Sequence, residues 1–203
     1  MSGYALVLTG RAVRALVVGG GEVAARKVRA LLPHAAHVRV VAPEPCATIA
    51  QLALSDPGRV SLLRRAYVAG DVDDAELVFA ATDARDVNAR VAADARSLRR
   101  LVNVADDPDA GSFVTPAQDG VDPLRFAVTA GVPDVSRRIL DQIVARFDAR
   151  YARAAGDLSR LRRRLLHAGA RGDWERAREE LLGDDFCASV EDGRFDARLA
   201  AWR

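Results

Sequence analysis

The sequence has little of what secreted, metal-binding or membrane proteins need. Its 203 residues include two cysteines, Cys46 and Cys187, which lie far apart and have no cysteine or histidine at metal-ligand spacing. Neither a disulfide framework nor a structural zinc site is indicated, and we expect no bound metal. No apolar run reaches the roughly 18 residues of a membrane span, and no cationic start precedes a long apolar stretch at the N-terminus. We therefore expect a soluble cytoplasmic protein without a membrane partner.

An excess of charge of one sign is also missing. The 30 basic and 28 acidic side chains leave a net charge of +2, which is too balanced for a dedicated basic face. We therefore expect no nucleic-acid partner. Half of the residues are hydrophobic and 29% are charged, as in folded globular proteins. The length predicts one main domain with a small appendage.

Short apolar runs alternate with helical patterns in the first half of the chain. The runs lie at residues 15–18, 38–41, 60–63, 77–81 and 101–104. Apolar residues at helical spacing follow three of them, at 24–32, 49–53 and 87–98. This alternation predicts an α/β fold with a doubly wound parallel sheet, the Rossmann arrangement, with right-handed crossovers. We assign it to residues 1–113.

The pattern changes after Asp106. Turn residues come first, and strands are expected at 113–114 and 124–129. A helix then carries an apolar stripe of Val135, Ile139, Ile143 and Phe147. Few strands are present to cover this stripe, so residues 114–148 are predicted to form a dimerisation region of a homodimer. Two further helices, separated by a turn at 168–172, predict a small helical domain over 149–203.

A glycine turn lies between the first predicted strand and the first predicted helix. Its pattern is Gly19-x-Gly21-x-x-Ala24, which in this position is a dinucleotide fingerprint. Glycines let the backbone approach a pyrophosphate, and the helix that follows aims free N–H groups at the anion. We therefore assign Gly19, Gly21, Glu22 and Val23 to NAD binding. The alternative is a glycine turn that only packs the strand against the helix.

Two further strand ends are expected to contact the cofactor. NAD commonly meets an acidic side chain at the end of the second strand, where this chain has Pro43 and Glu44 and no arginine that would favour a 2′-phosphate. This favours NAD over NADP, although Glu44 could equally be a solvated loop charge. Thr82 and Asp83 end the fourth strand and are expected to face the cofactor, to cap the following helix, or both.

Several segments combine into a more specific pattern. Residues 16–27 contain Gly-Gly-Gly-x-Val-Ala-x-Arg-Lys, and residues 102–108 contain Val-Asn-x-x-Asp-x-Pro; residues 40–43, 80–83 and 87–88 accompany them. The combination resembles the precorrin-2 dehydrogenases of siroheme synthesis, which occur as stand-alone enzymes and as the N-terminal part of siroheme synthases. The resemblance extends over about residues 5–148.

The resemblance implies an NAD-binding domain, a dimerisation region and a helical domain, assembled as a homodimer with active sites near the subunit interface. The family removes two hydrogens from precorrin-2, a polycarboxylated tetrapyrrole, and forms sirohydrochlorin and NADH. Some members also insert ferrous iron into the product. The length of this chain is similar to that of the monofunctional or dehydrogenase/chelatase type. One turn departs from the family pattern, since residues 129–134 lack its second glycine and its serine.

The same resemblance points to a catalytic residue. Transfer of a hydride to NAD must be accompanied by loss of a proton, so a proton acceptor is expected at the carboxyl end of the sheet. Asp106 follows the fifth predicted strand by two residues and matches the position of the family's catalytic aspartate. Its alternative role is structural, because Asp-Asp-Pro-Asp is also an ordinary turn. Asp107 is the less favoured neighbour.

Two other functions stay open at this stage. The protein could be a chelatase that loads iron or cobalt into sirohydrochlorin and uses NAD little. It could also be a non-catalytic NAD-sensing module that passes a signal through the helical tail. Asp106 together with Asn103 disfavours the sensor, because sensing needs no positioned carboxylate. Nothing in the sequence excludes the chelatase.

Overall fold

The computed structural model describes residues 3–8, 13–35 and 37–202. They divide into two compact units, one up to Thr115 and one from Pro116 onward. Residues 1–2, 9–12, 36 and 203 belong to the domain ranges expected from the sequence but lie outside the described residues. Within the described ranges, no helix combines the length and the apolar character needed to cross a bilayer.

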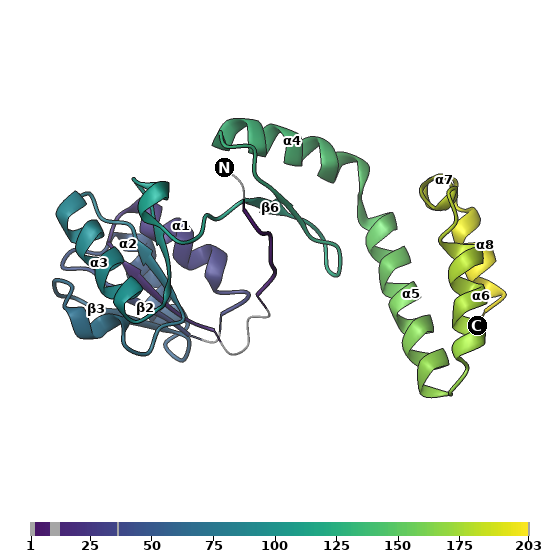
Figure 1. Cartoon of the computed structure of the whole chain (residues 1–203), viewed down its shortest axis with the longest axis horizontal. Helices are drawn as coiled ribbons and strands as arrows, with labels where there is room; N and C mark the ends of the chain where they lie inside the picture. The colour runs from purple at the N-terminus through teal and green to yellow at the C-terminus, as the bar shows by residue number, and fades with distance from the viewer. Residues whose placement is uncertain (1–2, 9–12, 36, 203) are drawn as a thin grey trace. The chain divides into compact units, whose positions relative to one another are not determined.

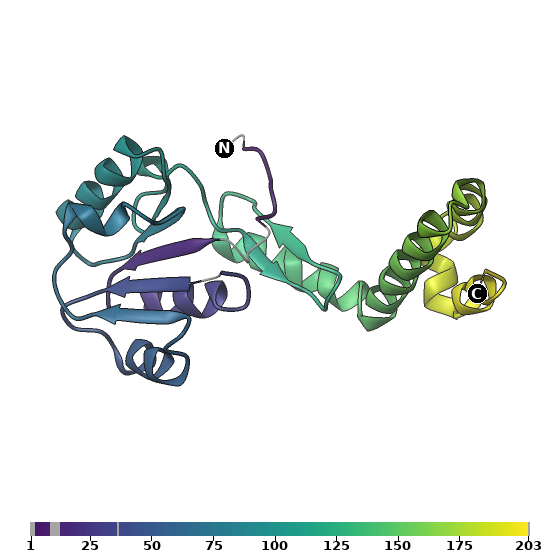
Figure 2. The ribbon, with the colours of Figure 1, turned by 90° about the horizontal axis from the view of Figure 1, so that it is seen from below.

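The first unit contains a five-stranded parallel sheet, so the expected α/β fold class is confirmed. The strand order is β3-β2-β1-β4-β5, and the arrows of β1, β2 and β3 in Figure 2 point the same way. The strands are β1 (Arg14–Val18), β2 (His37–Val41), β3 (Val60–Leu63), β4 (Leu77–Ala80) and β5 (Leu101–Val104). Val18 of β1 pairs with Val41 of β2 and with Ala80 of β4. The carboxyl ends of these strands therefore share one edge of the sheet.

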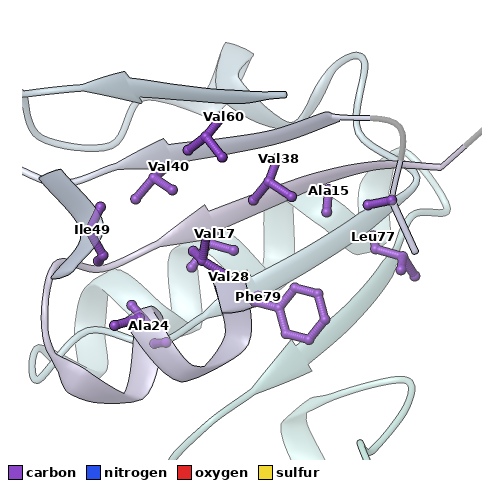
Figure 3. Packing of buried hydrophobic residues seen from close by; sticks show 13 residues of the cluster. Ala15, Val17, Ala24, Val28, Val38, Val40, Ile49, Val60, Leu77 and Phe79 are labelled. Carbon is purple, nitrogen blue, oxygen red and sulfur yellow. The ribbon is translucent and has the colours of Figure 1, made fainter. Parts of the chain in front are cut away.

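Helices cover both faces of the sheet. Helices α1 (Glu22–Leu31) and α2 (Ala47–Ser55) pack on one face, and α3 (Arg85–Ser97) with the short 3₁₀ helix η2 (Ala69–Val72) packs on the other. Alternate strand residues supply the two cores: Val17 lies in the α1/α2 core shown in Figure 3, and Leu16 lies in the α3 core. The crossovers thus change face between β1 and β4, which is where sheets of this kind bind ligands.

The last part of the first unit differs from the prediction. A 3₁₀ helix η3 (Pro108–Ala110) follows β5, and the strand expected at 113–114 was wrong. Side chains hold this segment instead of a strand ladder. The buried Asn103 donates a hydrogen bond of 3.1 Å from Nδ2 to the carbonyl of Phe113, and the Phe113 ring packs edge-on against Phe79 at 5.4 Å between centroids.

The second unit begins with an antiparallel hairpin of β6 (Ala117–Asp119) and β7 (Phe126–Val128), which contacts α4 (Pro133–Arg146). The sequence did not predict β6, and it predicted β7 as part of a longer strand. Helix α4 is followed by α5 (Ala149–His167), α6 (Arg171–Leu181), α7 (Phe186–Asp192) and α8 (Arg194–Ala200), which are labelled in Figure 1. The two expected helices correspond to α5 and α6, and the sequence missed α7 and α8, a further pair joined at Gly193, whose φ is +84°.

Candidate functional site

The glycine turn joins the end of β1 to α1 and is fixed by the neighbouring strand ends. Gly19 has a φ of +137°, and a Cβ on this residue would lie 2.2 Å from the carbonyl oxygen of Ala81, which follows β4. The carbonyl of Gly20 accepts a 2.8 Å hydrogen bond from the backbone of Cys46, which follows β2. Only a glycine turn can pass between these two strand ends at such close range.

Gly21 differs from Gly19 because the space around it is open. A Cβ at Gly21 would meet no heavy atom within 4 Å. Gly21 is the N-cap of α1 and supplies no side chain to the free N–H groups of the first turn. Behind it, Ala24 is fully buried, so the helix start lies close to the sheet. The open space and the uncapped N–H groups together fit a pyrophosphate.

The other residues of the phosphate prediction lie at the same turn. Glu22 and Val23 form the exposed start of α1, and Val23 is 40% exposed. These positions place backbone N–H groups, rather than buried side chains, beside the open space at Gly21. The contacts that Glu22 and Val23 make with a cofactor remain a prediction.

The segment after β2 is attached to the glycine turn. Pro43 and Glu44 are both exposed, and a Cβ on Gly20 would lie 2.3 Å from the carbonyl oxygen of Glu44. This close approach fixes the Glu44 backbone beside the phosphate turn, where a ribose hydroxyl would lie. The exposed Arg64, which the sequence analysis did not consider, directly follows β3, next to the end of β2 in the sheet.

The segment after β4 is organised by a buried asparagine. Asn88 of α3 is 1% exposed, and its Oδ1 accepts hydrogen bonds from the backbone N–H and the hydroxyl of Thr82 at 3.1 and 2.8 Å. Its Nδ2 donates to the carbonyl of Thr82 at 2.9 Å. The N-cap of α3 is Ala84, without a side-chain cap. The suggestion that Thr82 or Asp83 caps this helix was therefore wrong; Asp83 is exposed after β4.

The same asparagine contacts the predicted catalytic residue. Asn88 Nδ2 also donates a 2.9 Å hydrogen bond to Asp106 Oδ1, so it joins the segments that follow β4 and β5. The second carboxylate oxygen of Asp106 lies 3.7 Å from Arg85 Nε, and the Arg85 side chain is 90% exposed. The Asp106 side chain is about one-third exposed, since its fractional exposure is 33%. Asp106 thus combines a fixed position with a second oxygen open to a ligand.

The structural role considered for Asp106 belongs to its neighbour. Asp107 is the N-cap of η3, and its side chain accepts a 3.2 Å hydrogen bond from the N–H of Ala110. The two aspartates are therefore distinct in their contacts: Asp107 stabilises the turn, and Asp106 is bound by the amide of Asn88.

The only lysine of the chain also has specific contacts, which the sequence analysis missed. Lys27 Nζ donates a 2.7 Å hydrogen bond to Thr115 Oγ1 and lies 5.7 Å from the centroid of the Phe79 ring. Burial lowers the pKa of Lys27, and the nearby Arg26 adds to this effect. Lys27 thus fastens the last residue of the first unit to α1 and β4.

All predicted site residues of the first unit follow the carboxyl ends of β1, β2, β4 or β5. Three contacts described above bring all four of these ends together: Gly19 against Ala81, Glu44 against Gly20, and Thr82 to Asp106 through Asn88. Asn88 is the residue that the sequence-based site lacked. The available signal was that residues 87–88 belong to the pattern that carries the family resemblance. The hydrogen-bond partners of a buried asparagine on a helix, however, cannot be assigned from sequence alone.

Comparisons with known proteins show the family to which the chain belongs. A family model described as putative NAD(P)-binding matches residues 6–117. A siroheme synthase of Chromobacterium violaceum is 41% identical over 157 residues, which cover 76% of this chain and 33% of that protein. A siroheme synthase of Pseudomonas entomophila is 40% identical over 169 residues, covering 80% and 36%. The chain thus spans about a third of the length of the curated relatives that it matches.

The fold as a whole is also known from a solved structure. The structure named SirC, precorrin-2 dehydrogenase, superposes with a TM-score of 0.76 at 24% sequence identity. The match covers 98% of this chain and 99% of that one. The likeness therefore includes the second unit, which the family model does not reach.

Proposed function

Because the chain belongs to the putative NAD(P)-binding family, we propose that it is an NAD-dependent precorrin-2 dehydrogenase of siroheme biosynthesis. The observation that carries the proposal is the carboxylate of Asp106, held by Asn88 at the edge of the sheet that also carries the glycine turn. The names of the similar proteins, siroheme synthase and precorrin-2 dehydrogenase, support the choice of substrate.

Each residue has a defined task in this proposal. The N–H groups that begin α1 bind the pyrophosphate next to Gly21, and Glu44 accepts hydrogen bonds from the adenosine ribose. Bound NAD would supply the acceptor for the hydride that leaves a ring carbon of the tetrapyrrole. The reaction also releases a proton, which Asp106 accepts at Oδ2 while Oδ1 stays bound to Asn88. The cofactor would also contact Pro43 at the end of β2 and Thr82 and Asp83 at the end of β4.

The proposed task of Glu44 predicts a preference for NAD over NADP. A 2′-phosphate beside Glu44 would meet a like charge, so we expect NAD to bind at least about tenfold more tightly, a difference of roughly 1.4 kcal/mol. Titration calorimetry with the two nucleotides measures the ratio, and Glu44→Gln should narrow it. Tighter binding of NADP to the unmodified chain would contradict the assignment of Glu44 to the adenosine ribose. Arg64 would then be the candidate to bind the 2′-phosphate.

A homodimer is the second part of the proposal. Helix α4 buries Ser136 and Leu140 against its own unit but leaves Val135 and Ile139 exposed, at 46% and 42%. Val132, just before the helix, is 53% exposed. The other two residues of the expected stripe, Ile143 and Phe147, are half-buried, and the Phe147 ring packs 4.9 Å from Tyr151 between ring centroids. The exposed part of α4 would be covered by the same surface of a second copy.

This interface gives a prediction about oligomeric state. Ile139→Asp places a charge in the proposed contact, so light scattering should give a dimer for the unmodified chain and a monomer for the variant. Ala145→Asp, an exposed position on α4 outside the apolar stripe, is the matched control and should stay dimeric. A dilution-resistant monomer of the unmodified chain would refute the dimer.

Anaerobic incubation with precorrin-2 tests the function and separates it from its two competitors. With NAD present, the tetrapyrrole spectrum should change to that of sirohydrochlorin; without NAD, it should not. In a second reaction, ferrous iron is added to supplied sirohydrochlorin, and a spectral change there reports a chelatase activity. If only the iron step occurs, the protein is a chelatase, and if neither occurs although NAD binds, the sensing module gains support.

A further inference from the structure

We propose that Asn88 is a positioning residue for the reaction: its side-chain amide fixes Asp106 and leaves Asp106 Oδ2 as the oxygen that accepts the proton. This inference rests on the proposed role of Asp106 as the proton acceptor. Asn88 itself is too deeply buried to touch substrate, at 1% exposure, and acts only through its hydrogen bonds.

The orientation of the Asn88 amide follows from its partners. The backbone N–H of Thr82 can only donate, so the atom 3.1 Å from it must be the amide oxygen. The NH₂ group then necessarily faces the carbonyl of Thr82 and the carboxylate of Asp106, both at 2.9 Å. All donor and acceptor positions of the amide are thus used, which leaves it no alternative orientation.

This geometry makes the two oxygens of Asp106 unequal. Oδ1 accepts from the buried amide, and a hydrogen bond to a carboxylate is among the stronger ones. Oδ2 has the exposed Arg85 at 3.7 Å, a contact that water weakens. Two acidic residues follow the same pair of strands. Asp107, after β5, accepts its hydrogen bond from the N–H of Ala110, and Asp83, after β4, is exposed.

The test uses a substitution whose effect depends on pH. In Asn88→Asp, a carboxyl introduced at position 88 still accepts from Thr82, but when ionised it repels Asp106 instead of donating to it. Two adjacent carboxylates share one proton readily, and the singly protonated pair again supplies an O–H donor to Asp106. We expect kcat to fall by about 10- to 100-fold at neutral pH and to recover as the pH is lowered.

The matched control is Asn103→Asp. Asn103 is also buried, at 6% exposure, but its amide donates to the carbonyl of Phe113 and not to a carboxylate. Asn103→Asp should lower the stability of the fold, and its kcat should not rise as the pH is lowered. Equal pH profiles for the two variants, or a fully active Asn88→Asp enzyme at neutral pH, would overturn the inference.

A second measurement keeps the inference testable if Asn88→Asp does not fold or if the unmodified chain proves inactive on precorrin-2. In isotope-labelled protein, the side-chain NH₂ signals of Asn88 should move when Asp106→Asn removes the carboxylate, and they should stay in place in Asp107→Asn. If the Asn88 signals were unchanged by the Asp106 substitution, the hydrogen bond between Asn88 and Asp106 would be refuted. An inactive protein whose signals follow Asp106 would refute only the proposed function.

Discussion

Asp106→Asn is expected to lower turnover of precorrin-2 by about 10²–10⁴-fold, the usual loss when a general base is removed. Asparagine keeps the shape of the side chain, and its amide oxygen can still accept from Asn88 Nδ2. The turn itself is stabilised by Asp107, through the N–H of Ala110. The melting temperature and the affinity for NAD should therefore hardly change, and the loss should lie in kcat.

The matching substitution at the neighbouring position separates catalysis from turn structure. Asp107→Asn keeps a good N-cap residue on η3, so both turnover and stability should stay near those of the unmodified chain. Anaerobic kinetics, NAD titration and thermal unfolding of the two variants provide the comparison. A folded, NAD-binding Asp106→Asn variant with near-normal dehydrogenation would end the catalytic assignment.

Gly21→Asp is expected to abolish NAD binding without harming the fold. Aspartate is a preferred N-cap residue, and its Cβ at this position meets no heavy atom within 4 Å, so stability should be unchanged or a few tenths of a kcal/mol higher. The new carboxylate would bind the N–H groups that the pyrophosphate needs and would repel the anion. We expect the Kd for NAD to rise by about 100-fold or more, equivalent to ~2.7 kcal/mol.

Two other glycines provide the controls for this prediction. Gly58 also has open space around it, but it lies between α2 and β3, so Gly58→Asp should leave NAD binding intact. Gly19→Ala should instead destabilise the fold by more than about 1 kcal/mol, because Gly19 has a positive φ and a Cβ there would clash with the carbonyl of Ala81. Unimpaired NAD binding by Gly21→Asp would contradict a phosphate site at this turn.

The parallel sheet could be predicted from sequence because both of its faces are buried. Strands such as 15–18 are then continuous apolar runs, and the glycine turn after Val18 marks the first βα connection. The second unit was harder for a physical reason. Helices α7 and α8 have seven residues each, which is too short for a helical period to stand out, and β6 has three.

The site was predictable at the level of strand ends, but its side-chain contacts were not. Every proposed residue follows the end of a strand, and parallel pairing brings those ends to one edge. Asn88, in contrast, lies near the N-terminus of α3. Only the packing of that helix shows that the Asn88 amide reaches both Thr82 and Asp106. The strand expected at 113–114 failed for a similar reason, since Asn103 binds that segment through a side chain.

The most direct test of precorrin-2 dehydrogenation is to follow NADH and sirohydrochlorin together in one anaerobic reaction with precorrin-2 and NAD. Removal of two hydrogens as a hydride and a proton requires one NADH for each sirohydrochlorin. Both products should appear at the same rate and in equal amounts. The assignment as a dehydrogenase is contradicted if precorrin-2 stays unchanged in the presence of NAD while the same protein inserts ferrous iron into supplied sirohydrochlorin.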